Sequence, residues 1–174
     1  MSVSSEKLKI LREKLLDPGC RGGALLVVYP PEEELNFRSK YKELIQELKA
    51  HGVAVQVLDF RTLVFDVLEK KKLLEKAFKL DAANSRDAWQ NLARMVQRET
   101  ARRVHEAAEQ APDAILCCAY TASLHPWISF SALLEEIEGT VSNTLVIPFP
   151  GTENGPALHF LGVRDGYNYR AARI

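Results

Sequence analysis

The stretch "AILCCAYTASLHPWISFSALLEEIEGTVSNTLVIPF", residues 114–149, contains a strand–helix–strand pattern. Its two ends, Ala114 to Ala119 and Thr144 to Phe149, are short continuous apolar runs. Such runs are typical of strands that are buried on both faces. Between them, Ile128 to Ile137 has the spacing of a short helix, and Gly139 closes it. This stretch therefore predicts one unit of an α/β fold.

The same alternation extends toward the N-terminus. Two further apolar runs, Ala24 to Tyr29 and Val53 to Leu58, predict buried strands. Helical spacing of apolar residues predicts helices over Ser5 to Leu16, Asn36 to His51, Arg61 to about Leu80, and Asp87 to Gln110. The pattern predicts a mainly parallel sheet with helices on both faces. A length of 174 residues fits a single domain, residues 1–174.

The C-terminal segment follows a different pattern. "ALHFLGV", residues 157–163, and "YNYRAARI", residues 167–174, are two strand candidates without a helix between them. Arg164-Asp165-Gly166 joins them, and Asp-Gly is a strong hairpin signal. We therefore expect the sheet to end in antiparallel strands that form a C-terminal hairpin.

Two glycines, Gly151 and Gly155, follow the strand that ends at Phe149 and raise the question of a phosphate-binding loop. A P-loop needs G-x-x-x-x-G-K-[ST] followed by a helix. The two glycines here are four positions apart, and Pro156-Ala157 stands where Lys and Ser/Thr are needed. Proline also has no N–H to offer a phosphate. The loop is therefore interpreted as a turn between strands.

Candidate site residues follow the predicted parallel strands, because ligands bind beyond the carboxyl ends of such strands. These residues are Tyr29, Asp59, Tyr120, His125, Gly151 and Glu153. One interpretation makes Asp59 and His125 an acid–base pair in a pocket. The other makes Asp59 a helix cap and places His125 in a rigid packed loop. The second is favoured, because no nucleophile, second carboxylate or metal-ligand spacing accompanies the pair.

A basic strip is predicted on the long helix, where Arg94, Arg98 and Arg102 are four positions apart. Acidic residues on the same helix offset its arginines, so an ion-paired or solvated face is the default.

Lys plus Arg and Asp plus Glu are equal at 23 each, so no overall field attracts the chain to nucleic acid or membrane. The histidines form no HxH or HxxxH pair, so we expect no metal and no cofactor.

The cysteines and the N-terminus bear on location. Cys20, Cys117 and Cys118 have no CxxC spacing, which favours reduced, small buried thiols inside the cell. The first residues, "MSVSSEKLKILREKLLD", lack the apolar core of a secretory signal. No apolar run approaches the roughly 20 residues that span a bilayer. A cytoplasmic protein without membrane association is therefore expected.

The C-terminal sequence resembles that of the BrxB family, small components of BREX bacteriophage-defence systems. The family pattern is an apolar strand, a Tyr/Phe-Pro-Gly, a few polar residues with Gly, Leu-x-Phe-x-Gly, and a terminal Asn-Tyr-Tyr/Tyr-x-Arg-Ala. Here it falls on Phe149-Pro150-Gly151, Gly155, Leu158, Phe160, Gly162 and Asn168-Tyr169-Arg170-Ala171. The segment "SLHPWISFSALLEEIEG" and the first strand with Tyr29-Pro30 also resemble the family.

The resemblance implies a non-enzymatic accessory protein that acts with other BREX proteins, notably the alkaline-phosphatase-like PglZ, and through them reaches DNA. It carries over no catalytic residues, and no small-molecule substrate is expected. Two alternatives from the residues themselves stay open. One is a nucleotide-binding or hydrolytic domain that uses the strand-end crevice. The other is a nucleic-acid-binding module that uses the three arginines of the basic strip.

Overall fold

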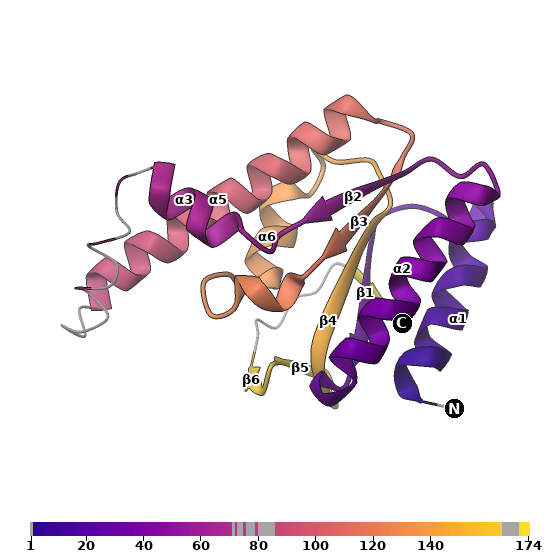
Figure 1. Ribbon diagram of the computed structural model, residues 1–174, viewed down its shortest axis with the longest axis horizontal. Helices are drawn as coiled ribbons and strands as arrows, with labels where there is room; N and C mark the ends of the chain where they lie inside the picture. Colours follow the sequence, from indigo (N-terminus) through magenta and orange to yellow (C-terminus); the bar gives the residue numbers. More distant parts are fainter. Residues whose placement is uncertain (1, 71, 73–74, 76–78, 80–85, 165–170) are drawn as a thin grey trace.

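Helices and strands alternate along the chain as the apolar pattern predicts (Figure 1). The computed structural model describes residues 2–70, 72, 75, 79, 86–164 and 171–174. The helices are α1 (Val3–Leu16), α2 (Glu34–Ala50), α3 (Leu63–Lys70), α5 (Arg86–Gln110) and α6 (Phe130–Ile137). The strands are β1 (Ala24–Tyr29), β2 (Val55–Asp59), β3 (Ile115–Ala119), β4 (Leu145–Asn154), β5 (Ala157–Phe160), β6 (Val163–Arg164) and β7 (Ala171–Arg173).

The main sheet has the strand order β2-β3-β4-β1-β7, and every pair along this path is parallel. The predicted parallel α/β fold is therefore confirmed. The longest pairing joins β1 to β4, from Ala24 opposite Leu145 to Tyr29 opposite Pro150. These two central strands are covered on both faces, which explains why both are continuous apolar runs.

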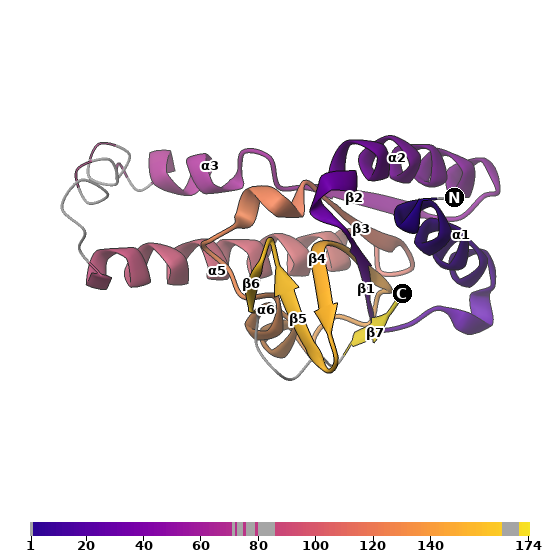
Figure 2. The same ribbon diagram turned by 90° about the horizontal axis from the view of Figure 1, so that it is seen from below.

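Helices cover both faces of the sheet, as expected (Figure 2). On one face, α1 and α2 bury Leu11, Phe37 and Leu48 against side chains of β1, β3 and β4. On the other face, α3, α5 and α6 bury a larger cluster that includes Val96, Val104 and Leu133. The two hydrophobic cores are therefore separated by the sheet itself. Packing on both faces holds the strands of the main sheet in place.

Helix α2 forms one wall of the site described below, and its sequence explains its position. Phe37, Tyr41, Leu44 and Leu48 recur every three or four residues and are all buried against the sheet. The helix ends where Gly52 adopts φ +77, a left-handed conformation that glycine tolerates. The residues of α2 that face away from this apolar stripe remain on the surface.

Antiparallel strands follow the parallel part of the sheet near the C-terminus, as expected, but the last strand pairs differently from the prediction. β4 continues beyond the main sheet and pairs antiparallel with β5, which pairs antiparallel with β6. The turn between β4 and β5 contains Gly155 at φ +60, which confirms that the glycine loop is a turn. β7 pairs with β1 in parallel, so the predicted pairing of the last strand with residues 157–163 is wrong. Asp165 and Gly166 lie outside the described residues.

The predicted helix from Arg61 to about Leu80 is interrupted, although Glu75 and Lys79 are again helical. Helix α3 ends at Lys70, and Lys72 has φ 53, which a right-handed helix cannot include. Lys72 donates its backbone N–H to the carbonyl of Glu69 as part of a turn. The remaining part of that prediction falls mostly on residues outside the described ranges. The long helix α5, in contrast, agrees with its predicted bounds within one residue.

Candidate functional site

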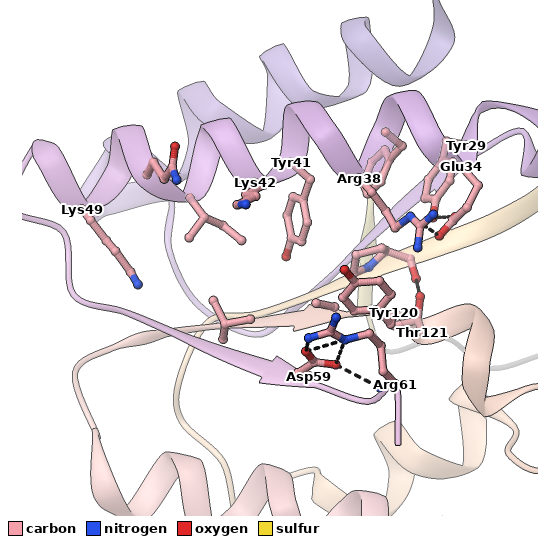
Figure 3. Close-up of a pocket in the computed structure, with 16 residues that line it drawn as sticks. Tyr29, Glu34, Arg38, Tyr41, Lys42, Lys49, Asp59, Arg61, Tyr120 and Thr121 are labelled. Atoms are coloured by element: carbon pink, nitrogen blue, oxygen red, sulfur yellow. Dashed lines mark hydrogen bonds and ion pairs between the residues drawn. The ribbon is translucent and has the colours of Figure 1, made fainter. Parts of the chain in front are cut away.

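A cavity of about 440 Å³ lies between α2 and the carboxyl ends of β2 and β3 (Figure 3). Three residues predicted from separate strand ends line it together, namely Tyr29 of β1, Asp59 of β2 and Tyr120 after β3. They meet because the carboxyl ends of parallel strands share one edge of the sheet. We call this cavity the α2 crevice.

Asp59 and Arg61 form an ion pair at the floor of the α2 crevice. The guanidinium of Arg61 donates to both carboxylate oxygens of Asp59, with an Nη2–Oδ2 distance of 2.6 Å. The backbone N–H of Arg61 also donates to Asp59, which makes a tight turn just before α3. Partial burial alone would raise the pKa of Asp59, but the hydrogen bonds and charge of Arg61 outweigh it and lower that pKa. Asp59 is therefore ionised and already engaged.

The ring of Tyr120 lies between two guanidinium groups from different elements (Figure 3). The Cζ of Arg61 is 4.5 Å from the ring centroid, and that of Arg38 from α2 is 5.2 Å away. Both distances are within the range of cation–π contacts. Tyr120 also has φ 59 and ψ 40, a left-handed conformation that costs a non-glycine residue about 1–2 kcal/mol. Strain of this kind is concentrated at ligand sites and active sites.

Tyr29 is held in place by its neighbours on α2. Its hydroxyl donates to the carboxylate of Glu34, and its ring stacks on Phe37 with centroids 3.8 Å apart. Burial, followed by the hydrogen bond to Glu34, raises the pKa of Tyr29 far above the usual value. Tyr29 is therefore a neutral wall residue, and Glu34 already has a donor.

Tyr41 is a buried residue that lines the α2 crevice, with only 4% of its surface exposed. Figure 3 shows its ring extending from α2 toward the space above the strands. Its hydroxyl has no hydrogen-bond partner of good geometry among the described residues, although the Cys117 thiol lies beside it. Burial raises the pKa of Tyr41, and it raises that of Cys117 to about 12, so both groups are protonated.

Several residues that line the α2 crevice were not identified as site residues from the sequence. They are Arg38, Tyr41, Lys42 and Lys49 of α2, together with Arg61. A signal was present, because residues 38, 42, 45 and 49 follow the three- and four-residue spacing of one helix face. The sequence did not show that this face of α2 borders a cavity, since a basic stripe on a helix ordinarily faces solvent.

The other predicted strand-end residues lie elsewhere. His125 packs against Phe160 with ring centroids 6.0 Å apart, whereas the carboxylate of Asp59 is engaged by Arg61. The structure therefore does not pair Asp59 with His125. Gly151 and Glu153 belong to the β4–β5 hairpin, where Glu153 is exposed. Neither of them lines the α2 crevice.

The predicted basic strip on α5 is divided between different environments. Arg102 donates to Glu99 at 2.7 Å and also to Glu106, so its charge is compensated on the helix. Arg94 is exposed, and Arg98 lines a groove of about 550 Å³ between α3 and α5. Arg103, which the sequence did not single out, joins the two helices through Asp66 at 2.8 Å. The predicted ion-paired face is therefore observed at Arg102.

Comparison with known proteins identifies one family. A family model described as "BREX protein BrxB" matches residues 56–174. Searches of curated proteins and of solved structures each returned no match. The matched range begins within β2 and includes the strand-end residues Asp59 and Tyr120, whereas the α2 wall of the crevice precedes it. Among the described residues, no helix has the length and apolar character needed to cross a membrane.

Proposed function

The chain belongs to the BrxB family of BREX phage-defence components, and we propose that it serves there as a non-enzymatic adaptor that binds a PglZ-like partner. The family match over residues 56–174 is the observation that carries this proposal. The proposed role as an adaptor within the cytoplasm goes beyond that match. It rests on the features of the described surface that follow.

The proposed docking surface is the arm formed by α3 and the N-terminal half of α5. Both figures of the fold show this arm extending away from the sheet, at the opposite end of the molecule from α1 (Figures 1 and 2). Phe65 of α3 is 58% exposed there, although it is a large aromatic residue. Exposed aromatic side chains are typical of the centres of protein–protein interfaces.

The groove between α3 and α5 adds complementary chemistry to this arm. Its apolar part includes Val67 and Met95, and its rim includes the cationic Lys70 and Arg98. The two carboxylates of the groove, those of Asp66 and Glu99, are already paired with arginines. An apolar groove with a basic rim suits a partner segment that combines an apolar anchor with acidic side chains. We infer that the PglZ-like partner contributes such a segment.

The non-enzymatic part of the proposal is supported by the environment of the candidate catalytic residues. Asp59 is bound to Arg61, and His125 packs against Phe160. An acid–base pair requires both groups within hydrogen-bond reach of one reacting atom. Their separate partners therefore support a binding role for this end of the sheet.

Co-purification of the tagged chain with the PglZ-like protein of the same BREX system tests the proposal. Wild-type protein is expected to retain the partner, and Phe65→Asp is expected to lose it. Ile10→Asp is the matched control, because Ile10 is also an exposed apolar residue, 42% exposed, but lies on α1. Absence of binding with both proteins folded would refute the adaptor role. Equal losses in the two variants would refute the arm as the docking surface.

A further inference from the structure

We propose that the α2 crevice binds an anionic ligand that carries a flat ring, of the class of a mononucleotide, through the lysines of α2 and the apolar surface between α2 and β2. This inference goes beyond the adaptor role and does not depend on it. The sequence led us to expect no small-molecule substrate, and the proposal concerns a bound ligand rather than a reaction. It rests on the charges and the apolar surface of one cavity.

The charges of the crevice favour an anion. Its cationic residues are Arg38, Lys42, Lys49 and Arg61, and its carboxylates are Glu34 and Asp59. Both carboxylates are already engaged, Asp59 by Arg61 and Glu34 by the Tyr29 hydroxyl and, at 3.5 Å, by Arg38. Lys42 and Lys49 form no ion pair with any described residue. A bound phosphate would supply the missing counter-charge.

Tyr41 contributes its ring, and not its hydroxyl, to the wall of the crevice. The hydroxyl is buried, and the Cys117 thiol lies beside it. A ligand in the crevice therefore meets the ring of Tyr41.

The remaining surface suits a flat ring. Val57 of β2 is 41% exposed and lines the crevice together with Ile45 of α2. An exposed valine on a strand beside a helix offers an apolar surface on which a planar ring can lie. The Tyr120 ring, with the guanidinium groups of Arg38 and Arg61 over it, closes the other end of the crevice. A volume of about 440 Å³ is within the range of small-ligand pockets.

Isothermal titration of the full chain with AMP, adenosine and inorganic phosphate tests this proposal at low ionic strength. AMP is expected to bind more tightly than either of its parts, because only AMP engages the lysines and the apolar surface together. Its affinity is expected to fall as salt is added, since exposed ammonium groups are screened. Saturable binding of phosphate alone, equal to that of AMP, would refute the ring subsite.

Variants on α2 give the sharper test. Lys42→Ala and Lys49→Ala are each expected to weaken AMP binding by about tenfold, the effect of losing one charge-assisted hydrogen bond. Lys40→Ala is the matched control, because Lys40 is an exposed lysine on the same helix that contacts Ser5 of α1 instead. Tyr41→Phe keeps the buried ring and removes only the hydroxyl, so it is expected to fold and to bind AMP as tightly as wild-type protein does.

The outcomes separate this proposal from the adaptor role. Absence of AMP binding by folded wild-type protein, or unchanged binding in the Lys42→Ala, Lys49→Ala double variant, would overturn the proposal. The same double variant is expected to co-purify with the PglZ-like partner as wild-type protein does, because the α3–α5 arm is intact in it. Loss of AMP binding with retained partner binding therefore supports two distinct sites.

Discussion

Gly151 on β4 packs so closely against His159 on β5 that a Cβ at position 151 would lie 2.2 Å from the His159 carbonyl oxygen. The ring of Phe149 would also be 2.9 Å from that Cβ. Gly151 and Phe160 are opposite one another in the antiparallel ladder, so the backbone of β5 cannot move away without breaking it. The glycine of the Pro150-Gly151 pair is therefore required by close packing of two strands.

Gly151→Ala is expected to destabilise the fold by about 3 kcal/mol, because overpacking against backbone forces a shift of the strand. Gly155→Ala is the control, since Gly155 has φ +60 but no atom of the described residues within 4 Å of an added Cβ. Its cost is expected to be about 1 kcal/mol, from the backbone conformation alone. Urea unfolding of both variants measures the difference, and equal costs would contradict the packing argument.

The thiols are expected to differ sharply in reactivity. The prediction of buried thiols holds for Cys117 and Cys118, whose pKa values are raised by burial, but it is wrong for Cys20, which is exposed. A thiol reagent should therefore modify one cysteine in the folded protein and all three in denaturant. Rapid labelling of more than one thiol in the folded state would contradict the burial of Cys117 and Cys118 in β3.

Asp17 is expected to restrain the reactivity of Cys20. The Cys20 thiol donates to Asp17 with an Sγ–Oδ2 distance of 3.2 Å, and this hydrogen bond raises the pKa of Cys20. Asp17→Ala should accelerate labelling of Cys20 at pH 8, because a larger fraction becomes thiolate. Asp113→Ala, at another exposed aspartate, is the control and should leave the labelling rate unchanged.

Acid is expected to weaken the ion pairs of α5. Hydrogen bonds from Arg102, with further contributions from Arg103, lower the pKa of Glu99 from 4.5 to about 2. A carboxylate with a lowered folded-state pKa stabilises the fold above its unfolded pKa, and that stability is lost as the pH falls from about 4.5 toward 2. Glu99→Gln should therefore reduce the free energy of unfolding at pH 7 by about 1 kcal/mol. It should also make that free energy depend less on pH below about 4.5. Urea midpoints between pH 7 and pH 3 measure this change.

The α3–α5 arm is expected to depend in part on the pair of Arg103 and Asp66. Their side chains are 27% and 45% exposed, so the pair should contribute about 0.5 kcal/mol. A double-mutant cycle with Arg103→Ala and Asp66→Asn measures this coupling from urea unfolding. Strictly additive effects would mean that the apolar contacts of α3 hold the arm without help from this pair.

Much of the fold could be predicted from local patterns. The buried strands read as apolar runs, and helices α1, α2, α5 and α6 follow the spacing of their apolar residues. The interpretation of the glycine loop as a turn also holds, because the motif lacks the residues that phosphate binding needs. The end of α3 was missed, since the apolar spacing continues past the left-handed Lys72 where the helix stops.

The candidate site could be predicted only in part. The meeting of Tyr29, Asp59 and Tyr120 follows from parallel strands, because such strands share one carboxyl edge. The other three predicted residues do not line the crevice. The loop after β3 places His125 against Phe160, and the extension of β4 places Gly151 and Glu153 in the β4–β5 hairpin. The basic residues of α2 were not connected with the site, because nothing local tells which side of a helix overhangs a strand end.

The sequence by itself determined the class of fold, the type of almost every element and the family, because apolar periodicity and turn residues act over a few neighbouring positions. Only the tertiary structure decided that β7 joins β1 and that Lys42, Tyr41 and Lys49 line one cavity with Asp59 and Tyr120. Those contacts join residues distant in the chain, and they depend on how whole elements pack to bury two hydrophobic cores at once. No short stretch of sequence contains that information.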